Sequence, residues 1–414
     1  MSIKTIRVSN FKSFKELTLS LNHFNVLIGA NAAGKSNFLQ IFKFLRDLAK
    51  DGLENAISLQ GGPQYLRNIR LGPNKPFVLT VNCERPIKLL DRKNDLEIRS
   101  FEQTYTLKIS FRKTRYEVST EQLTLNARLF PFTNGSKTGK ASAEIGHGEI
   151  VFLNDKGKLS VSAKLSNGTK LDYGSLLQVS RTDETSRISA PIFEDAALLP
   201  MYPSFKAFFS EFGTFDFDPK LPKRAIPMTG KRELEEDGSN LALILRHIAG
   251  DRQKKQLFST LIQELLPFVD ALEIEHFADN LLFLKLRENY EKEVGLPASF
   301  LSDGTINITA MLIALYFEQR PFIVLEEPER NIHPFLISKL VEMMRDASSE
   351  KQIITTTHHP EIVRHGGIEN LLLITRDKSG FSTISRPAEK ETIKTFLKNE
   401  IGIEELYIQD LLGL

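Results

Sequence analysis

The sequence predicts an α/β protein with a mixed, mostly parallel sheet, an antiparallel β-rich segment and a helical insert. Three observations lead to this fold class. Apolar strands alternate with helical periodicity near both ends of the chain, a pattern typical of parallel sheets. Short alternating stretches separated by turns fill residues 76–173. Between residues 239 and 266, apolar side chains recur every three or four positions, as they do in helices.

The N-terminal stretch contains the first strands and the first helix. Residues 3–21 alternate as in two paired strands, and residues 23–28 (HFNVLI) form a short apolar strand. A glycine-rich turn follows at once, and helical periodicity runs from Ser36 to Lys50. We expect residues 1–80 to be the N-terminal part of a nucleotide-binding head.

Two different segments separate this part from the C-terminal part. Stretches such as FVLTV, YTLKISF and EIVFL are separated by Asn-Gly or Asp-Lys-Gly turns, which predicts an antiparallel β-rich subdomain over residues 81–180. The periodic stretch SNLALILRHIAGDRQKKQLFSTLIQELL predicts a helical insert over residues 181–290.

The C-terminal part, residues 291–414, returns to alternating helices and strands. We expect helices over 305–319 and 334–347, and strands at PFIVLEE, KQIITTT and LLLITR. Residues 391–414 are expected to form a short helical tail with no nuclease domain behind it. Strands of this kind would complete the sheet begun near the N-terminus.

Composition excludes several classes of protein. The chain has 414 residues, 41% of them hydrophobic, and a net charge of +2, which gives no overall sign of polyanion binding. The single cysteine, Cys83, cannot form an internal disulfide and is expected in the core. Neither a secretory signal nor an apolar run of membrane-spanning length is present. We therefore expect a cytoplasmic protein with no membrane partner.

A phosphate-binding motif follows the first apolar strand. The run GANAAGKS fits G-x-x-x-x-G-K-[ST] between a strand and a helix, the context that this motif requires. Backbone N–H groups of such a loop point at phosphates, Lys35 would reach the β- and γ-phosphates of ATP, and Ser36 would hold Mg²⁺. The alternative is a glycine-rich turn with a chance Gly-Lys-Ser. We expect the nucleotide-binding residues to be Gly29, Asn31, Ala32, Ala33, Gly34, Lys35, Ser36 and Asn37.

An acidic strand end supplies groups for magnesium binding and catalysis. In PFIVLEEPE, apolar residues precede Glu326 and Glu327. We expect Glu326 to bind Mg²⁺, directly or through water, and Glu327 to act as general base on the attacking water. Taken alone, this stretch could equally be a buried strand that ends in a solvated acidic turn.

A histidine follows the next predicted strand, in Thr357-His358-His359-Pro360. An imidazole at the end of a neighbouring strand could hydrogen-bond the γ-phosphate or the attacking water. A histidine before proline can also be structural, and the residues alone do not choose between His358 and His359.

Together these motifs resemble those of the ABC ATPases of the RecF, SMC and OLD group, especially their stand-alone AAA family ATPases. The resemblance implies an ABC-type P-loop NTPase head without a nuclease domain, and it favours His358 as the catalytic histidine. The stretches that carry it are VSNFKSF, FNVLIGANAAGKSN, LEEDGSNLALIL, LSDGT, EEPERNIHP and THHP.

The same resemblance implies roles for further residues. Ser302, Asp303 and Gly304 of LSDGT would form a signature loop that caps the γ-phosphate bound by a partner chain, although LSDGT alone reads as an ordinary helix N-cap. Asn331 would lie in the D-loop, which communicates across the dimer, and Lys12 and Ser13 would lie near the nucleotide. The sequence departs from the group in having Glu326 where aspartate is usual. Two candidates exist for the glutamine that links magnesium to the second lobe, Gln60 and Gln64.

The expected function is an ATP-binding and ATP-hydrolysing dimerising switch that controls DNA or an effector protein, in DNA repair or anti-phage defence. We expect a homodimer or a higher assembly, formed through composite ATP sites. The alternative is an ATP-bound scaffold or sensor of a bacterial defence or toxin complex whose effector is a separate protein. A transporter subunit fits less well, because a long insert separates the two halves. Two basic clusters could contact DNA or could be solvated faces: Arg85–Arg115, with Lys88, Arg92, Lys93, Arg112 and Lys113, and Lys220–Arg232, with Lys223, Arg224 and Lys231.

Overall fold

The chain divides into two compact units, each built from separate stretches of sequence. The computed structural model describes residues 2–112, 115–132, 143–172, 203–277, 280–398 and 402–413. The first unit comprises Met1–Asn22, Asn31–Phe212 and Thr375–Ile384. The second comprises His23–Ala30, Gly213–Ile374 and Ser385–Leu414. The strand predicted at residues 23–28 therefore belongs to the same unit as the strands predicted at PFIVLEE and KQIITTT.

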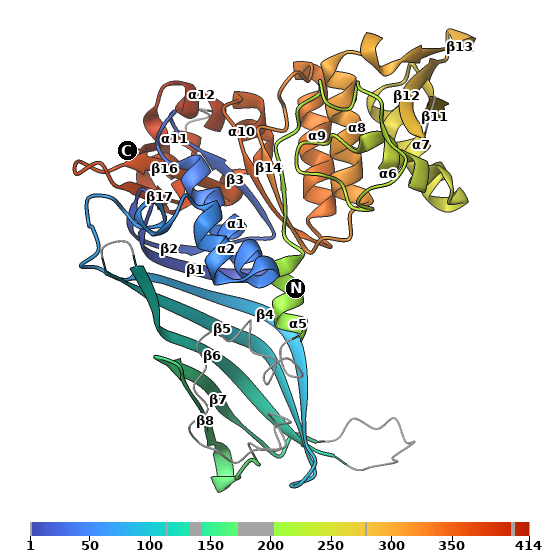
Figure 1. Ribbon diagram of the computed structural model, residues 1–414. Coiled ribbons are helices and arrows are strands. Elements are labelled where there is room, and N and C mark those ends of the chain that lie inside the picture. The colour runs from blue at the N-terminus through green and yellow to red at the C-terminus, as the bar shows by residue number, and fades with distance from the viewer. Residues whose placement is uncertain are drawn as a thin grey trace. The chain divides into compact units, whose positions relative to one another are not determined.

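The first unit contains a seven-stranded antiparallel sheet of order β2-β1-β4-β5-β6-β7-β8 (Figure 1). Its pairing confirms the two N-terminal strands and the antiparallel segment predicted from the alternating sequence. The strands are β1 (Ser2–Phe11), β2 (Phe14–Ser20), β4 (Phe77–Asp91), β5 (Leu96–Arg112), β6 (Arg115–Pro131), β7 (Gly146–Asp155) and β8 (Lys158–Leu165).

One face of this sheet is apolar and carries the first helix, α1 (Lys35–Asp51). Alternate side chains of β4, from Phe77 to Cys83, are buried, as expected where a strand has one covered face. The Phe44 ring of α1 packs edge-on against Phe77, with ring centroids 5.5 Å apart. Cys83 is buried as expected, and burial raises the pKa of its thiol. The unit also contains α2 (Leu53–Leu59), α3 (Pro63–Leu66) and α5 (Pro203–Ser210).

The second unit contains five parallel strands of a six-stranded sheet, in the order β16-β3-β15-β14-β9. All four neighbouring pairs are parallel. Every residue of β3 and β15 is buried, because a parallel sheet is covered on both faces. The strands are β3 (Phe24–Ile28), β9 (Gly213–Phe215), β14 (Phe322–Glu326), β15 (Gln352–Thr356) and β16 (Leu371–Arg376).

Three of the four strands of a smaller antiparallel sheet in the second unit lie within residues 181–290, for which we predicted only helices. Leu282, Leu284 and Leu286 are buried on alternate positions of β12, so the period there is two and not 3.6. β12 pairs with the other three strands of this sheet. The strands are β10 (Ile226–Pro227), β11 (Val269–Phe277), β12 (Leu281–Glu288) and β13 (Glu291–Pro297).

The helices of the second unit share one apolar core with its sheets. They confirm the helices predicted on either side of β14 and in the C-terminal tail. They are α6 (Leu241–Ala249), α7 (Arg252–Leu265), α8 (Asp303–Tyr316), α9 (Pro334–Ala347), α10 (Pro360–Gly366), α11 (Glu391–Lys398) and α12 (Ile403–Ile408). Short 3-10 helices lie at Ser166–Gly168, Ala298–Phe300, Ile368–Asn370, Pro387–Glu389 and Leu411–Gly413. The fold is thus a mixed α/β fold with several sheets. None of the helices described is long and apolar enough to cross a membrane.

Candidate functional site

The glycine-rich loop has the backbone that an anion-binding loop needs. Gly34 has a φ of 118° and Ala32 a φ of 60°, so the chain turns through the left-handed region before α1 begins at Lys35. Gly34 occupies the N-cap position of α1 and provides no side-chain cap, and the first turn contains no acidic residue. No carboxylate of the first turn therefore competes for the N–H groups at the start of this helix, and the helix start fits a phosphate group.

The other residues of the glycine-rich motif differ in their exposure to solvent. Ser36 is exposed in the first turn of α1, and Asn31 is exposed on the loop, whereas Ala33 is buried. Lys35 and Asn37 are half-buried. Gly29 belongs to the second unit, where a Cβ atom at its position would lie 2.3 Å from the carbonyl oxygen of Ile374. Only glycine fits there.

A C-terminal hairpin holds the loop, a feature that sequence reasoning missed. The hairpin consists of residues 375–384, which include most of β17 (Ser382–Ser385), and it belongs to the first unit. Nε and Nη2 of Arg376 donate to the carbonyl oxygen of Ala32, at 3.1 and 2.9 Å. Oγ of Ser382 lies 2.5 Å from the carbonyl oxygen of Ala33 and 2.8 Å from Oγ of Ser13. Three carbonyl or hydroxyl groups of the loop region are thereby fixed.

Lys12 and Ser13 lie in a tightly bonded turn of the first unit. The Lys12 backbone has a φ of 44°, and Nδ2 of Asn68 donates to its carbonyl oxygen at 2.6 Å. Partial burial lowers the pKa of the Lys12 ammonium. A buried cation gains from a nearby anion, because the anion restores the favourable interactions that were lost with water. Lys12 is therefore suited to a position beside phosphate.

In the second unit, three strand ends bring separate motifs to one edge of the parallel sheet. β3, β15 and β14 are neighbours and parallel, so their carboxyl ends share this edge. β3 ends before Gly29, β15 before Thr357 and His358, and β14 at Glu326. The backbone N–H of Glu327 donates to the carbonyl oxygen of Thr356 at 3.1 Å, which continues the pairing past the strands.

Glu327 is constrained at both its backbone and its side chain. Its φ is 44°, an uncommon backbone conformation for a residue with a side chain. Its Oε1 lies 3.4 Å from Nε2 of His358, and its Oε2 lies 3.1 Å from Nη2 of Arg330. The side chains of Glu327 and His358 are each about one-third exposed, so they can meet a solvent-borne ligand. Sequence reasoning predicted Glu327 and His358 but missed Arg330.

Glu329 connects the acidic turn to the histidine loop. Oγ1 of Thr357 donates to Oε1 of Glu329 at 2.5 Å, while Oε2 of Glu329 is buried without a hydrogen-bond partner. Burial raises the pKa of the Glu329 carboxyl, against the opposing effect of the Thr357 hydrogen bond. His359, the residue after His358, caps α10 by accepting from the Glu361 N–H at 3.2 Å, which is a structural role.

The signature loop and Asn331 are in direct contact. A Cβ atom on Gly304 would lie 2.5 Å from the carbonyl oxygen of Asn331, whose φ is 65°. Ser302 caps α8, since its Oγ accepts from the Thr305 N–H at 3.1 Å, and Asp303 pairs with Lys223 at 2.5 Å. LSDGT therefore does serve as a helix N-cap, and the glycine is required by the close approach of Asn331.

In the part of the chain that the structure describes, no cluster of protein ligands marks a metal site. Within the described ranges, no group of three or more His, Cys, Asp or Glu side chains could hold a metal ion. Glu326 is half-buried at the end of β14, opposite Thr356 in the sheet register. A magnesium ion usually enters with few protein ligands and with phosphate oxygens and waters. Glu326 in the second unit offers a carboxylate oxygen, and Ser36 in the first unit a hydroxyl oxygen, of the kind that such an ion uses.

The two glutamine candidates differ in burial. Gln60 is buried and donates from Nε2 to Oε1 of Gln40 at 3.1 Å, while its own Oε1 is buried without a partner. Gln64 is exposed in α3. Neither geometry selects the magnesium-linking glutamine.

The predicted basic clusters contain many ion pairs. Lys88 pairs with Glu97 at 2.6 Å, Lys223 with Asp303, and Lys231 with Glu235 at 3.0 Å. Lys113 lies outside the described residues. These pairs reduce the positive charge available to a polyanion.

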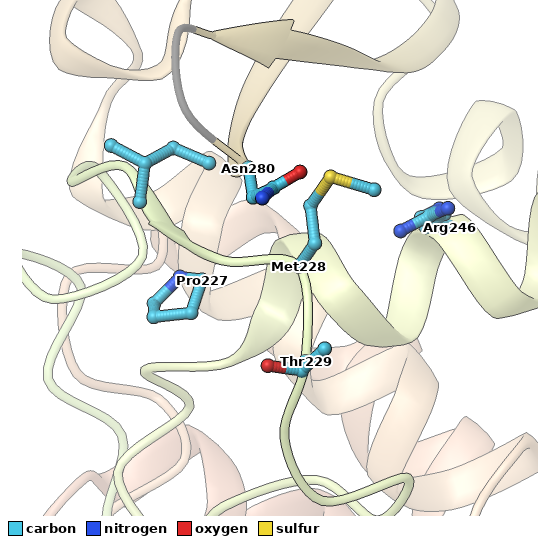
Figure 2. A pocket seen from close by; sticks show the side chains of 6 residues that line it. Pro227, Met228, Thr229, Arg246 and Asn280 are labelled. Atoms are coloured by element: carbon cyan, nitrogen blue, oxygen red, sulfur yellow. The ribbon is translucent and has the colours of Figure 1, made fainter.

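The second unit also has a surface hollow of about 600 Å³ (Figure 2). It is lined by three apolar and three polar side chains, with Arg246 of α6 as its charged group. None of the predicted site residues contributes to it. The lining residues are Pro227, Met228, Thr229, Arg246, Asn280 and Leu281.

Comparisons with solved structures return SMC head domains, at low similarity. A crystal structure of the SmcHead bound to the C-winged helix domain of ScpA has 14% identity and a TM-score of 0.47, and covers 93% of this chain and 98% of that chain. The SMC head domain from Thermotoga maritima has 14% identity and a TM-score of 0.41, and covers 93% and 99%. A Pyrococcus furiosus Smc head with an extended coiled coil, bound to the C-terminal domain of ScpA, has 12% identity and a TM-score of 0.45, and covers 96% and 99%. These values are too low to indicate a function.

The comparison with protein families is decisive. No curated protein matches significantly. One family model, described as "AAA domain, putative AbiEii toxin, Type IV TA system", matches residues 24–364, which is most of the chain and includes the phosphate loop, the signature loop, the acidic strand and His358. The chain therefore belongs to this AAA-domain family of ATPases, as its motifs led us to expect.

Proposed function

We propose that this chain binds and hydrolyses ATP with Mg²⁺ and acts as a dimerising switch that couples its nucleotide state to DNA or to an effector protein. DNA repair and anti-phage defence are the settings that we propose. The observation that carries the proposal is the edge of the parallel sheet, where neighbouring strands end at Gly29, at His358 and at Glu326 and Glu327. An electrophilic phosphate, a base and a polarising group are needed together in phosphoryl transfer.

In this proposal the triphosphate is bound by the glycine-rich loop and the start of α1. Lys35 neutralises the β- and γ-phosphates, and loop N–H groups donate to them, with Asn31, Ala32, Ala33 and Asn37 lining the loop. Lys12 and Ser13 lie beside the nucleotide. Ser36 and Glu326 would hold Mg²⁺, which when bound offsets phosphate charge. The uncapped helix start at Gly34 supports this assignment.

Hydrolysis in this proposal uses Glu327 and His358. Glu327 accepts a proton from the attacking water while the water oxygen bonds to the γ-phosphorus and the bond to the ADP oxygen breaks. His358 donates a hydrogen bond to the γ-phosphate or to the water. Their 3.4 Å separation supports action on one substrate group.

Each site in this proposal is completed by a second chain. Ser302, Asp303 and Gly304 cap the γ-phosphate bound to the partner, and Asn331 passes the state of one site to the other. Two observations support this role. Asp303 is paired with Lys223, so its negative charge is compensated where an anion would approach, and Gly304 contacts Asn331.

A second candidate is an ATP-bound scaffold or sensor in a bacterial defence or toxin complex, with a separate effector protein. The description of the family, which names a putative toxin of a type IV toxin–antitoxin system, favours it. The ion pairs within the basic clusters also reduce the case for DNA contact. Turnover that is stimulated by DNA and falls steeply with salt would instead favour direct DNA action.

The dimerising switch is tested by the mass in solution of the Glu327→Gln protein with and without Mg-ATP. We expect ATP to double the mass, because the variant binds ATP without hydrolysing it. Adding Ser302→Arg should abolish the doubling, since a large cation at the N-cap blocks the signature loop. A mass that ignores bound ATP would contradict the switch and favour the scaffold, and turnover at the wild-type rate by Glu327→Gln would refute the assignment of the base.

A further inference from the structure

The carboxylate of Glu327 is held at both of its oxygens by side chains of its own unit. Nη2 of Arg330 lies 3.1 Å from Oε2, and Nε2 of His358 lies 3.4 Å from Oε1. His358 has a proposed task on the phosphate, but Arg330 has none. Its side chain is 45% exposed, so its contribution to stability as a surface ion pair is small.

Arg330 is fixed at its backbone as well as at its side chain. Its N–H donates to the carbonyl oxygen of Glu327 at 3.0 Å, and its own carbonyl oxygen accepts from Nδ2 of Asn307, on α8, at 2.6 Å. These bonds close a tight turn between the acidic strand and Asn331. The guanidinium therefore starts from a rigid backbone.

The far side of the guanidinium is anchored by Asp216. Nη1 of Arg330 donates to Oδ1 of Asp216 at 3.0 Å, while Nη2 faces Glu327. Asp216 directly follows β9, the strand next to β14 in the parallel sheet, and its N–H donates to the carbonyl oxygen of Glu236 at 2.9 Å. The planar guanidinium thus spans two carboxylates that are each tied to the sheet, an arrangement that a lysine ammonium cannot reproduce.

We propose that Arg330 is a positioning residue for ATP hydrolysis, which holds Glu327 in its working orientation and is itself anchored by Asp216. This inference rests on the proposed role of Glu327 as general base. A glutamate side chain has several rotatable bonds, and a base that points away from the water by about 1 Å loses up to about 100-fold in rate. Arg330 retains Oε2. When His358 turns to the γ-phosphate, Oε1 is released to accept the proton of the water.

The test measures kcat and KM for Mg-ATP by phosphate release, using the full chain. Arg330→Ala should lower kcat by about 10- to 100-fold and change KM by less than about 3-fold, because the orientation of the base does not affect binding. Arg330→Lys should recover part of the loss, and Asp216→Asn should cause a smaller loss of about 3- to 10-fold. Arg364→Ala is the matched control, since Arg364 also lies between two carboxylates, Glu361 and Glu404, and is similarly exposed.

A second measurement separates positioning from a general structural defect. If Arg330 acts through Glu327, then Arg330→Ala should cause no further loss of the residual turnover in a Glu327→Gln background. The ATP-dependent doubling of mass of that variant should also persist. Unchanged kcat in Arg330→Ala, or an equal loss in both backgrounds, would overturn the inference.

The same set of variants distinguishes this inference from the proposed function. Turnover at the wild-type rate by Glu327→Gln would refute both the role of Glu327 as general base and the positioning role of Arg330. If Glu327→Gln is inactive and Arg330→Ala is fully active, only the positioning role of Arg330 is refuted.

Discussion

The glycine-rich loop of the first unit and the acidic edge of the second unit are built in opposite ways. The residues that define the loop are consecutive, and its constraints fall on the backbone: positive φ at Gly34 and carbonyl oxygens held by Arg376 and Ser382. The acidic edge is assembled from three strands far apart in sequence, and its constraints fall on the side chain of Glu327. A loop that holds a ligand needs a fixed backbone, whereas a group that moves a proton needs a fixed side chain.

This contrast predicts that damage to the loop removes binding, while damage to the edge removes turnover alone. The largest effect is expected from Gly34→Ala. Its Cβ atom would lie 2.3 Å from Oγ of Ser382 and 2.9 Å from Oγ of Ser13, at a φ of 118°, and both serines are buried. Strain of this kind costs about 1–3 kcal/mol, which together with the clash predicts at least about 100-fold weaker ATP binding.

Calorimetry or a fluorescent ATP analogue measures this loss. Gly62→Ala is the control, because Gly62 has a φ of 93° but no atom within 4 Å of the place that a Cβ would occupy, so it reports strain without a clash. Wild-type affinity in Gly34→Ala would show that the loop does not bind the nucleotide. Retained affinity in Glu327→Gln, beside its loss in Gly34→Ala, would establish the division of tasks.

The two regions also differ in how far the sequence revealed them. The loop was predictable because its residues are adjacent and each has a local reason, and β14 and β15 were predictable because their apolar runs end at polar residues. The side chains that contact these regions from distant parts of the sequence were not predictable. Arg376 meets Ala32 across 344 positions, and Arg330 meets Asp216 across 114. A charged residue in a turn gives no signal of which distant group it will contact.

Secondary structure was also predictable only where a local pattern identified it. The strands β11 and β12 follow directly after the predicted helices, and their own alternating period was overlooked beside the stronger helical period of residues 239–266. Strand β9 has three residues and owes its place to pairing with β14, so no local pattern identifies it. The turn at Asp377–Gly380 is readable as a turn, but its contact with the loop is not.

A smaller loss of ATP affinity is expected from changes in the hairpin that contacts the loop. Ser382→Ala removes a buried hydroxyl that lies 2.5 Å from the carbonyl oxygen of Ala33. A lost hydrogen bond of this kind is worth about 1 kcal/mol, which predicts about 3- to 10-fold weaker ATP binding with little change in kcat. Arg376→Ala should have a smaller effect, because Arg376 is exposed.

Thr383→Ala is the control for this experiment. Thr383 is the next residue on the same strand and is exposed, with a hydroxyl 3.2 Å from that of Thr375. Equal affinities for Ser382→Ala and Thr383→Ala would mean that the hairpin does not shape the loop. A drop in kcat at unchanged affinity would erase the contrast between the two regions.

The smallest effect concerns stability at the acidic edge and depends on pH. The pKa of the Glu329 carboxyl is raised by burial, so folding favours its protonated form. The resulting stability is fully present below the unfolded pKa of about 4.5 and is lost as pH rises through the folded pKa. Glu329→Gln keeps an acceptor for Thr357 without the buried charge, and should raise the free energy of unfolding by about 1 kcal/mol at pH 8.

The pH dependence of that gain tests its cause. Thermal melts of the two proteins from pH 8 to pH 5 should converge as the pH falls, because wild-type Glu329 takes up a proton while the glutamine does not titrate. A constant difference between the curves would point to altered packing, and a less stable Glu329→Gln protein at pH 8 would mean that the donors around this carboxylate outweigh its burial. In that case hydrogen bonds would stabilise the acidic edge, as they stabilise the loop, by more than the buried charge of Glu329 destabilises it.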